Sequence, residues 1–179
     1  MTKTNKTEAP ETSLTLREFC DRIGVKYRDA RYVLAHGMIP DGIEEEPGRG
    51  NHRTFNYRQA FWLAIVLKLK AAGIQPKLAA DMAKWAERVK GFALNLGWDW
   101  NFSPFDGKFA TEKQWYMEVG DAQFVRLLTD ASPSREGVMD ESGWVEMNSR
   151  KRQGNAAPTV IVRIDLSSLS NQLFEAMRR

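Results

Sequence analysis

The chain has 179 residues, of which 42% are hydrophobic and 27% are charged. These proportions are typical of a folded globular protein and exclude a chain that is disordered over most of its length. No apolar run approaches the roughly 18–20 residues of a membrane helix, and residues 1–13 lack the apolar core of a secretory signal, so we expect a cytoplasmic protein with no membrane contact. The single cysteine, Cys20, excludes an intramolecular disulfide and a multi-cysteine metal cage.

The net charge of +3 is distributed unevenly along the chain. Residues 1–90 hold 16 Lys and Arg against 11 Asp and Glu, whereas residues 91–179 hold 10 against 12. A basic first half favours contact with a polyanion. Many domains with an excess of this size bind nothing charged, so the charge by itself does not decide the function.

Helical spacing of apolar residues begins after a tail without periodicity, which we expect to be disordered. The first predicted helix has Ser13 or Thr15 as its candidate cap, and its inward residues are Leu16, Phe19, Cys20 and Ile23. Gly24 ends this helix, and the second predicted helix extends from Lys26 to His36.

The next segment, from Pro40 to Phe55, is rich in proline and glycine, and its ends can pair as a small β-hairpin. A third helix is predicted from Tyr57 to Ala72 with Asn56 as its cap, and Gln75–Pro76 opens a fourth. In the fourth helix, apolar residues are spaced 4, 3, 4, 3 and 4, which is typical of a coiled-coil seam and predicts a dimer interface. An amphipathic helix packed on its own domain has the same pattern, so both interpretations stay open. The seam residues are Leu78, Met82, Trp85, Val89, Phe92 and Leu96.

After Gly97 the pattern becomes extended. The aromatic-rich stretch from Trp98 to Tyr116 is either the core of a small sheet or the lining of a ligand pocket. The predicted elements of this half are strands at Lys113–Val119, Gln123–Leu128, Gly143–Asn148 and Thr159–Asp165, and a closing helix at Ser167–Arg179. In the strand at Thr159–Asp165, Val160, Val162 and Ile164 are expected to share one face.

The first two predicted helices and the short turn between them form a helix-turn-helix pattern, in which the second helix can enter a DNA major groove. The outward residues of that second helix are basic or aromatic. Arginine suits such a face because its guanidinium can bind a phosphate or the two acceptors of guanine. A charged helix that faces only solvent has the same composition, so this alternative stays open. The candidate DNA-binding residues are Lys26, Tyr27, Arg28, Arg31 and Tyr32.

The segment GVKYRDARYVLAHGMIP resembles the recognition-helix signature of the MerR-type winged helix-turn-helix proteins, G-V-x-x-R-x-x-R-Y-Y-x-x-x-G-L-I-P. The matching residues are Gly24, Val25, Arg28, Arg31, Tyr32, Gly37, Ile39 and Pro40. The following NHRTFN resembles the family's wing motif, with Arg53 two residues before Phe55, and IVLKLKAAGIQP is similar to the long third helix and the turn after it. The resemblance covers about Leu14 to Val89, half of the chain.

This resemblance implies a winged helix-turn-helix that binds double-stranded DNA as a homodimer and regulates transcription. It implies that the second helix contacts a major groove, that Arg53 on the wing contacts the backbone or a minor groove, and that Arg58 on the third helix helps to set the orientation. It also admits an architectural DNA binder, as in phage excisionases and the small subunits of viral terminases. A third class of function is a protein–protein adaptor, in which the winged fold mediates assembly.

Three features depart from the family pattern. Val33 stands where the second tyrosine of the usual pair is expected. The loop from Pro40 to Arg53 is longer than usual and contains three consecutive glutamates at 44–46, which would repel a phosphate backbone. The sequence after Gly97 resembles no effector domain of the family.

We therefore expect an α+β protein with an N-terminal winged helix-turn-helix, a linking helix and a small β-containing C-terminal domain. The expected divisions are a disordered tail at 1–13, the winged helix-turn-helix at 14–76, the linking or dimerisation helix at 77–97 and the C-terminal domain at 98–179. We expect no metal, no cofactor and no enzymatic activity, because His36 and His52 have no partner carboxylate or nucleophile in a motif and Cys20 lies on the inner face of its helix. We expect an effector, a small molecule or a protein, to act on the C-terminal domain if one exists.

Overall fold

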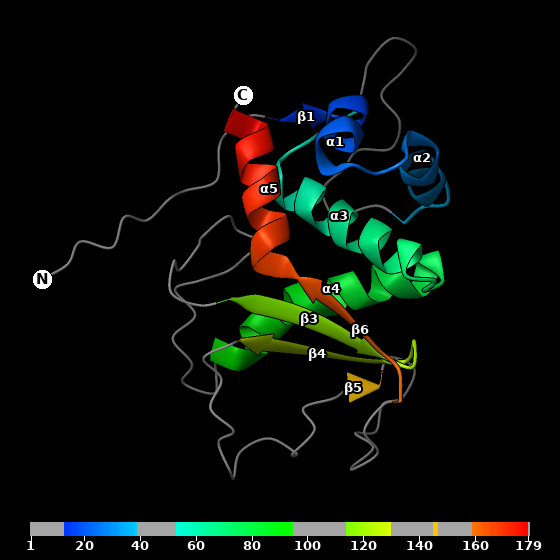
Figure 1. The fold of residues 1–179 in the computed structure, drawn as a ribbon, viewed down its shortest axis with the longest axis vertical. Helices are drawn as coiled ribbons and strands as arrows, with labels where there is room; N and C mark the ends of the chain where they lie inside the picture. The colour runs from blue at the N-terminus through cyan, green and yellow to red at the C-terminus, as the bar shows by residue number, and fades with distance from the viewer. Residues whose placement is uncertain (1–12, 39–52, 95–113, 130–144, 147–158, 179) are drawn as a thin grey trace, which may run out of the picture.

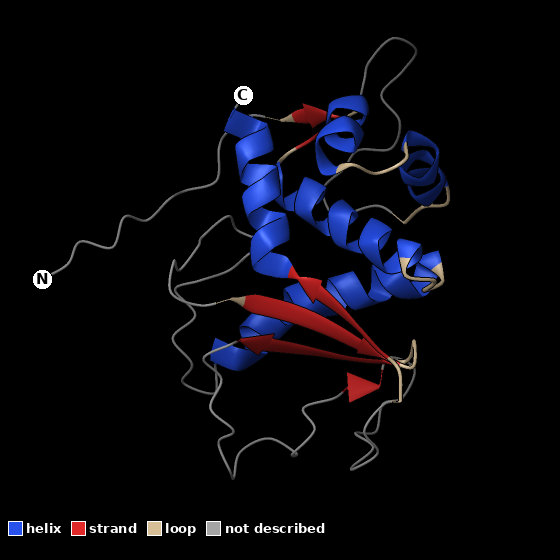
Figure 2. Cartoon of the chain, viewed as in Figure 1, coloured by secondary structure: helices blue, strands red, loops and turns tan. Residues whose placement is uncertain are grey.

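A computed structural model describes residues 13–38, 53–94, 114–129, 145–146 and 159–178. Within these residues lie five helices and two antiparallel sheets, which confirms the α+β class (Figures 1 and 2). The elements are β1 (Leu14–Thr15), α1 (Leu16–Ile23), α2 (Tyr27–Ala35), β2 (Thr54–Phe55), α3 (Tyr57–Ala71), α4 (Pro76–Leu94), β3 (Trp115–Gly120), β4 (Phe124–Thr129), β5 (Val145–Glu146), β6 (Ile161–Asp165) and α5 (Leu166–Arg178).

Local chemistry fixes the ends of α1. Thr15, not Ser13, is its N-cap: the Glu18 backbone N–H donates to the Thr15 hydroxyl at 3.3 Å, and the Thr15 backbone N–H donates to the Glu18 carboxylate at 2.8 Å. At the other end, Gly24 adopts a left-handed conformation with a φ of 71°, which glycine tolerates because it has no Cβ. This tight turn directs the chain into α2, which lies within the predicted Lys26–His36 helix.

The centre of the molecule is α3, which is apolar on all sides and packs against α2, α4 and α5. Asn56 caps it as expected, in a capping box with Gln59. Its buried residues are Tyr57, Ala60, Phe61, Trp62, Leu63, Ala64, Ile65, Val66, Leu67 and Leu69.

The last helix, α5, packs against α1 and α3, so the end of the chain completes the core begun by its first helices (Figure 1). The Tyr57 hydroxyl of α3 and the Ser170 hydroxyl of α5 are hydrogen-bonded to each other and buried. One cluster of buried apolar residues extends from Leu14 to Met177. The predicted boundary near residue 97 therefore does not separate two hydrophobic cores.

The larger sheet has the strand order β5-β4-β3-β6, with antiparallel neighbours throughout. One face, which includes Met117, Val119 and Ile164, belongs to the common core. In Figure 2, α4 lies behind β3 and β4, and the other four helices lie above the sheet. The name "outer face" is used below for the opposite side of the sheet, which carries Tyr116, Glu118, Arg126 and Arg163.

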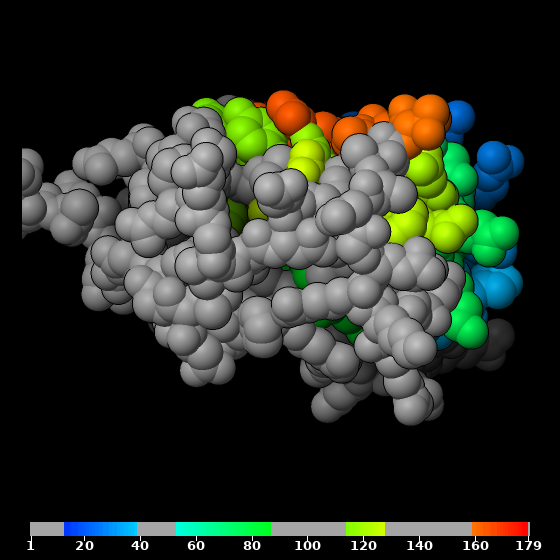
Figure 3. Space-filling view, turned by 90° about the horizontal axis from the view of Figure 1, so that it is seen from below, coloured from blue at the N-terminus to red at the C-terminus, as the bar shows by residue number. Residues whose placement is uncertain are grey.

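Val160, predicted to share a face with Val162 and Ile164, directly precedes β6 and is 62% exposed, whereas Ile164 is buried. Its backbone N–H donates to the carboxylate of Asp121 in the β3–β4 turn at 2.9 Å, so it lies just before the first paired residue of β6. Figure 3, seen from below, shows the orange residues around β6 at the molecular surface.

The predicted dimer seam lies on α4. Met82 is fully buried within the single chain, and Leu78 and Trp85 are partly buried and pack against the same core. These contacts are those of an amphipathic helix packed on its own chain. The side chains of Val89, Phe92 and Leu96 lie outside the described residues, and the dimer interface stays a prediction.

Candidate nucleic-acid interface

The second helix presents one buried side and one exposed side. Ala30, Val33 and Leu34 are buried against the core, whereas Tyr27 and Tyr32 are 48% and 46% exposed. All five candidate residues of this helix are exposed to solvent, as an outward orientation requires. They are called the α2 face below: Lys26, Tyr27, Arg28, Arg31 and Tyr32.

The basic residues of the α2 face form no ion pair within the described residues, although the charges of Lys26 and Arg28 act on the neighbouring Asp29. None of the ion pairs within the described part of the chain involves Lys26, Arg28 or Arg31. Arg28 and Arg31 are three residues apart on the helix and therefore share a side. Two guanidinium groups in this state can bind phosphate oxygens or the acceptor edge of a guanine without first breaking an internal ion pair.

One edge of the α2 face meets the end of α3. The Lys70 Nζ donates to the Asp29 carboxylate at 3.0 Å and lies 6.0 Å from the centroid of the Tyr32 ring. The Tyr32 ring lies 4.0 Å from that of His36, whose Nδ1 is 2.8 Å from the Tyr32 carbonyl oxygen. The hydrogen bond from Lys70 holds the pKa of Asp29 below its usual value.

Sequence reasoning missed the contact between Asp29 and Lys70. The two residues are 41 positions apart, and neither belongs to a motif that would pair them. Asp29 alone, one acidic residue on a helix of basic and aromatic side chains, was the available signal that a partner is needed.

The other two candidate DNA-binding residues lie on different elements. Arg53 is half-buried directly before β2, which pairs with β1 through Leu14 and Phe55. Arg58 is exposed at the start of α3, twelve residues before Lys70 and so about 18 Å away along the helix axis. Arg58 therefore lies at the end of α3 that contacts α5, and the structure does not bring it to the contact between α2 and α3. The expected wing at 39–52, with its glutamates at 44–46, lies outside the described residues.

Cys20, the single cysteine of the chain, is buried in the core, as expected, and burial raises the pKa of its thiol to about 11. No group of three or more His, Cys, Asp or Glu side chains that could hold a metal ion is found among the described residues. Of the aromatic-rich stretch, Trp115 is part of the core, and residues 98–113, like His52, lie outside the described residues.

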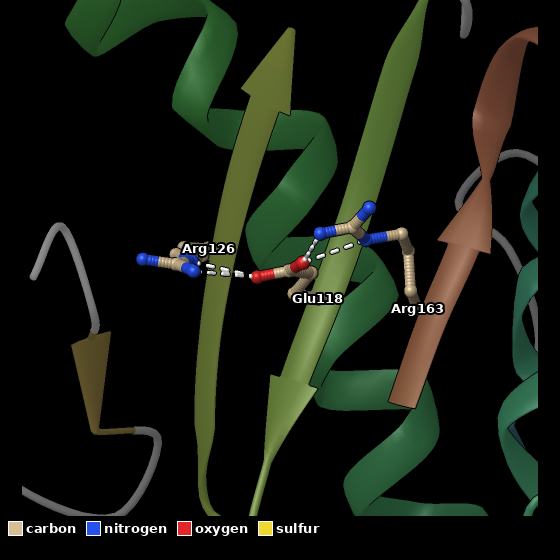
Figure 4. Close-up of polar contacts among 3 residues, drawn as sticks. All are labelled: Glu118, Arg126 and Arg163. Atoms are coloured by element: carbon tan, nitrogen blue, oxygen red, sulfur yellow. Dashed lines mark hydrogen bonds and ion pairs between the residues drawn. The ribbon is translucent and has the colours of Figure 1, made fainter. Parts of the chain in front are cut away.

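A second group of arginines lies on the outer face of the sheet (Figure 4). Glu118 on β3 is 1% exposed and accepts hydrogen bonds from Arg126 Nε on β4 at 2.8 Å and from Arg163 Nε on β6 at 2.7 Å. Burial raises the pKa of Glu118, and the two arginines lower it by more, so that it lies below its usual value. Arg163, although 59% exposed, is held by this carboxylate and by the Tyr116 ring, 5.3 Å away.

Comparisons with known proteins supply no assignment, since no family model and no curated protein sequence matches the chain. None of the helices in the described ranges combines the length and the apolar character that are needed to cross a bilayer. The function is therefore inferred from the α2 face, whose cations form no ion pair within the described residues.

Proposed function

We propose that the protein binds double-stranded DNA through the α2 face, in a winged helix-turn-helix arrangement, and acts as a sequence-specific transcriptional regulator. The observation that carries this proposal is the set of exposed cations at Lys26, Arg28 and Arg31, which form no ion pair within the described residues and lie beside two exposed tyrosines. Arginine and lysine supply phosphate and guanine contacts, and tyrosine hydroxyls donate to phosphates.

The shape of α2 is compatible with this role, because an α-helix with its side chains is about 10–12 Å across and a B-DNA major groove is about 12 Å wide. The helix packs against α1 and α3, with Ala30, Val33 and Leu34 on its buried side, and it lies at the edge of the molecule (Figure 1). The order of helix, tight turn, helix and small β1–β2 sheet supports the winged arrangement.

The regulatory role and the homodimer rest on the resemblance to the MerR-type proteins. Two copies would place two α2 faces in successive major grooves, which is the usual geometry for symmetric operators. The apolar seam of α4 is the proposed interface, through Trp85 and the residues that follow it.

The decisive test compares Arg28→Ala and Arg31→Ala with Arg178→Ala. Arg178 is an exposed arginine at the end of α5, which Figure 1 shows on the other side of the molecule from α2. Binding is measured by titration with DNA fragments selected from genomic DNA and with random DNA. We expect each α2 variant to lose about 1–3 kcal/mol of binding free energy for the selected site and to discriminate less between sites.

The control should bind like the parent protein, and all three variants should keep the parent's unfolding free energy to within about 0.5 kcal/mol. Equal affinity of the parent and both α2 variants would overturn the proposal. Binding without sequence preference would favour the architectural role, and no binding at all would favour the adaptor.

Arg53 sits on a different element and has a different expected signature. Arg53→Ala should weaken all DNA sequences alike, and the slope of log affinity against log salt should fall by about 0.9 for each phosphate that the protein no longer neutralises. A change of sequence preference in this variant would instead indicate a base contact.

A further inference from the structure

We propose that Lys70 of α3 is a positioning residue of the DNA-binding surface: by binding the Asp29 carboxylate, it keeps the edge of the α2 face electrically neutral. This inference rests on the proposed function. It adds Lys70, a residue from a different helix, to that surface, and Lys70 has this effect without contacting the DNA.

Asp29 is placed where an unpaired carboxylate would oppose DNA. It follows Arg28 directly, and its side chain lies at the boundary between the buried and the exposed sides of α2. A phosphate bound by Arg28 would meet this negative charge at short range, where repulsion between like charges is only partly screened by water and salt.

Lys70 removes this charge from the surface. Its Nζ donates to Asp29 at 3.0 Å, and both side chains are only partly exposed, so the pair is less screened than a surface ion pair. Lys70 lies in the last turn of α3, directly after Leu69, which is fully buried in the core, so the ammonium group is presented from a helix that is anchored in the core.

Protonation does not offer another route to neutrality. The hydrogen bond from Lys70 lowers the pKa of Asp29, and the charges of Lys70, Arg28 and Lys26 add to this effect. The carboxylate is therefore ionised at neutral pH, and among these cations Lys70 is the one in ion-pair contact with it.

The same ammonium group also borders the aromatic part of the face. It lies 6.0 Å from the Tyr32 ring centroid, at the outer limit of a cation–π contact, and the Tyr32 ring also contacts the tilted ring of His36, with the centroids 4.0 Å apart. Lys70 therefore lies beside one acidic and one aromatic residue of the same edge, Asp29 and Tyr32, and replacing it changes the surroundings of both side chains.

The experiment uses Lys70→Met, Asp29→Asn and the double variant in the full chain, with Lys70→Arg as the matched control. DNA affinity, its salt dependence and thermal unfolding are measured for each. Because Lys70→Met leaves one uncompensated charge near the phosphates, we expect its affinity to fall about three- to tenfold. The double variant and Lys70→Arg, which keep the edge neutral, should bind within about twofold of the parent protein, whereas Asp29→Asn, which leaves the Lys70 ammonium uncompensated, should bind DNA about three- to tenfold more tightly.

Two results would overturn the inference. Lys70 would bind a phosphate directly if the double variant bound as weakly as Lys70→Met and the salt slope of both variants fell by about 0.9. The ion pair would be purely structural if Lys70→Met changed the unfolding temperature but not the affinity.

Failure of the inference and failure of the proposed function give different results. If Arg28→Ala and Arg31→Ala bind DNA like the parent, both fail together. If those two variants weaken binding and Lys70→Met does not, the DNA-binding surface stands and only the role of Lys70 is wrong.

Discussion

The α2 face and the outer face of the sheet each carry two arginines, but they differ in the carboxylates around them. Arg28 and Arg31 have no acidic partner among the described residues, whereas Arg126 and Arg163 both bind Glu118, which is 1% exposed. A guanidinium that already binds a buried carboxylate gains little from a phosphate, because the internal pair must be broken first. The pairing of the cations, more than their number, therefore distinguishes a surface that can bind a polyanion.

The α2 face itself shows the same principle within one helix. Its single acidic residue, Asp29, is bound by Lys70 from α3. In the sheet, Arg126 and Arg163 both bind the Glu118 carboxylate. At the edge of α2, Lys70 binds the Asp29 carboxylate, and the neighbouring Arg28 and Arg31 form no ion pair within the described residues. The net charge difference between the halves of the sequence points to the same region, but it does not show which cations are available.

The largest expected effect is on the outer face of the sheet, where both arginines bind Glu118. Glu118→Gln removes the buried charge and leaves two arginines facing each other. Breaking a buried ion pair costs several kcal/mol, and the exposure of the arginines reduces that cost, so we expect a loss of about 2–4 kcal/mol of unfolding free energy. Urea unfolding measures the loss, while DNA affinity should not change. If Glu118→Gln lowered the DNA affinity without lowering the unfolding free energy, the outer face would be the surface that binds DNA.

Acid should act on the same group. Because the folded-state pKa of Glu118 is below that of the unfolded chain, its contribution to stability is complete above about pH 4.3, the usual glutamate value, and is lost as the pH falls through the lower folded value. The unfolding free energy of the parent protein should therefore fall more steeply below about pH 4 than that of Glu118→Gln. Parallel curves for the two proteins would show that the arginines do not favour the ionised form.

The next prediction tests whether the sheet and the first helices unfold as one unit. Ser170→Ala leaves the buried Tyr57 hydroxyl without its partner on α5, at a cost of about 1–3 kcal/mol. Adding Tyr57→Phe should recover part of that loss, since no unpaired hydroxyl is left. Fluorescence and circular dichroism should report one shared unfolding transition for each variant. Two separated transitions would show that the sheet and the first helices fold independently, despite their common core.

A crossed pair of substitutions sharpens the comparison directly. Arg31→Gln should cost about 1–3 kcal/mol of DNA binding and little stability, because no internal partner is lost. Arg163→Gln should cost about 1 kcal/mol of stability, since its exposed guanidinium is well screened, and should leave DNA affinity unchanged. If both variants lose the same amount in both measurements, the distinction between paired and unpaired arginines has no functional meaning.

The sequence predicts those parts of the molecule that depend on neighbours along the chain. Thr15 is one of the two residues that the sequence offers as the cap of α1, Gly24 marks the end of that helix, and the Asn56 cap marks the start of α3. The alternation of β3 places Glu118 opposite Met117, but it does not say which strands lie on either side, so the two arginines could not be assigned. Lys70 was missed for the same reason, and the position of α5 against α1 follows from packing alone.

The smallest expected effect concerns the tyrosine at the edge of the α2 face. Tyr32→Phe removes a hydroxyl that we expect to donate to a phosphate but keeps the ring, which lies 4.0 Å from that of His36. Since one hydrogen bond contributes about 0.5–1.5 kcal/mol net, affinity should fall about two- to tenfold for all DNA sequences alike. Tyr116→Phe is the matched control, because Tyr116 lies on the outer face beneath Arg163, and its affinity should equal that of the parent. If Tyr32→Phe instead lowers the unfolding temperature, its hydroxyl serves packing. If it changes neither quantity, the arginines alone carry the backbone contacts, and the α2 face is narrower than the exposure of Tyr32 indicates.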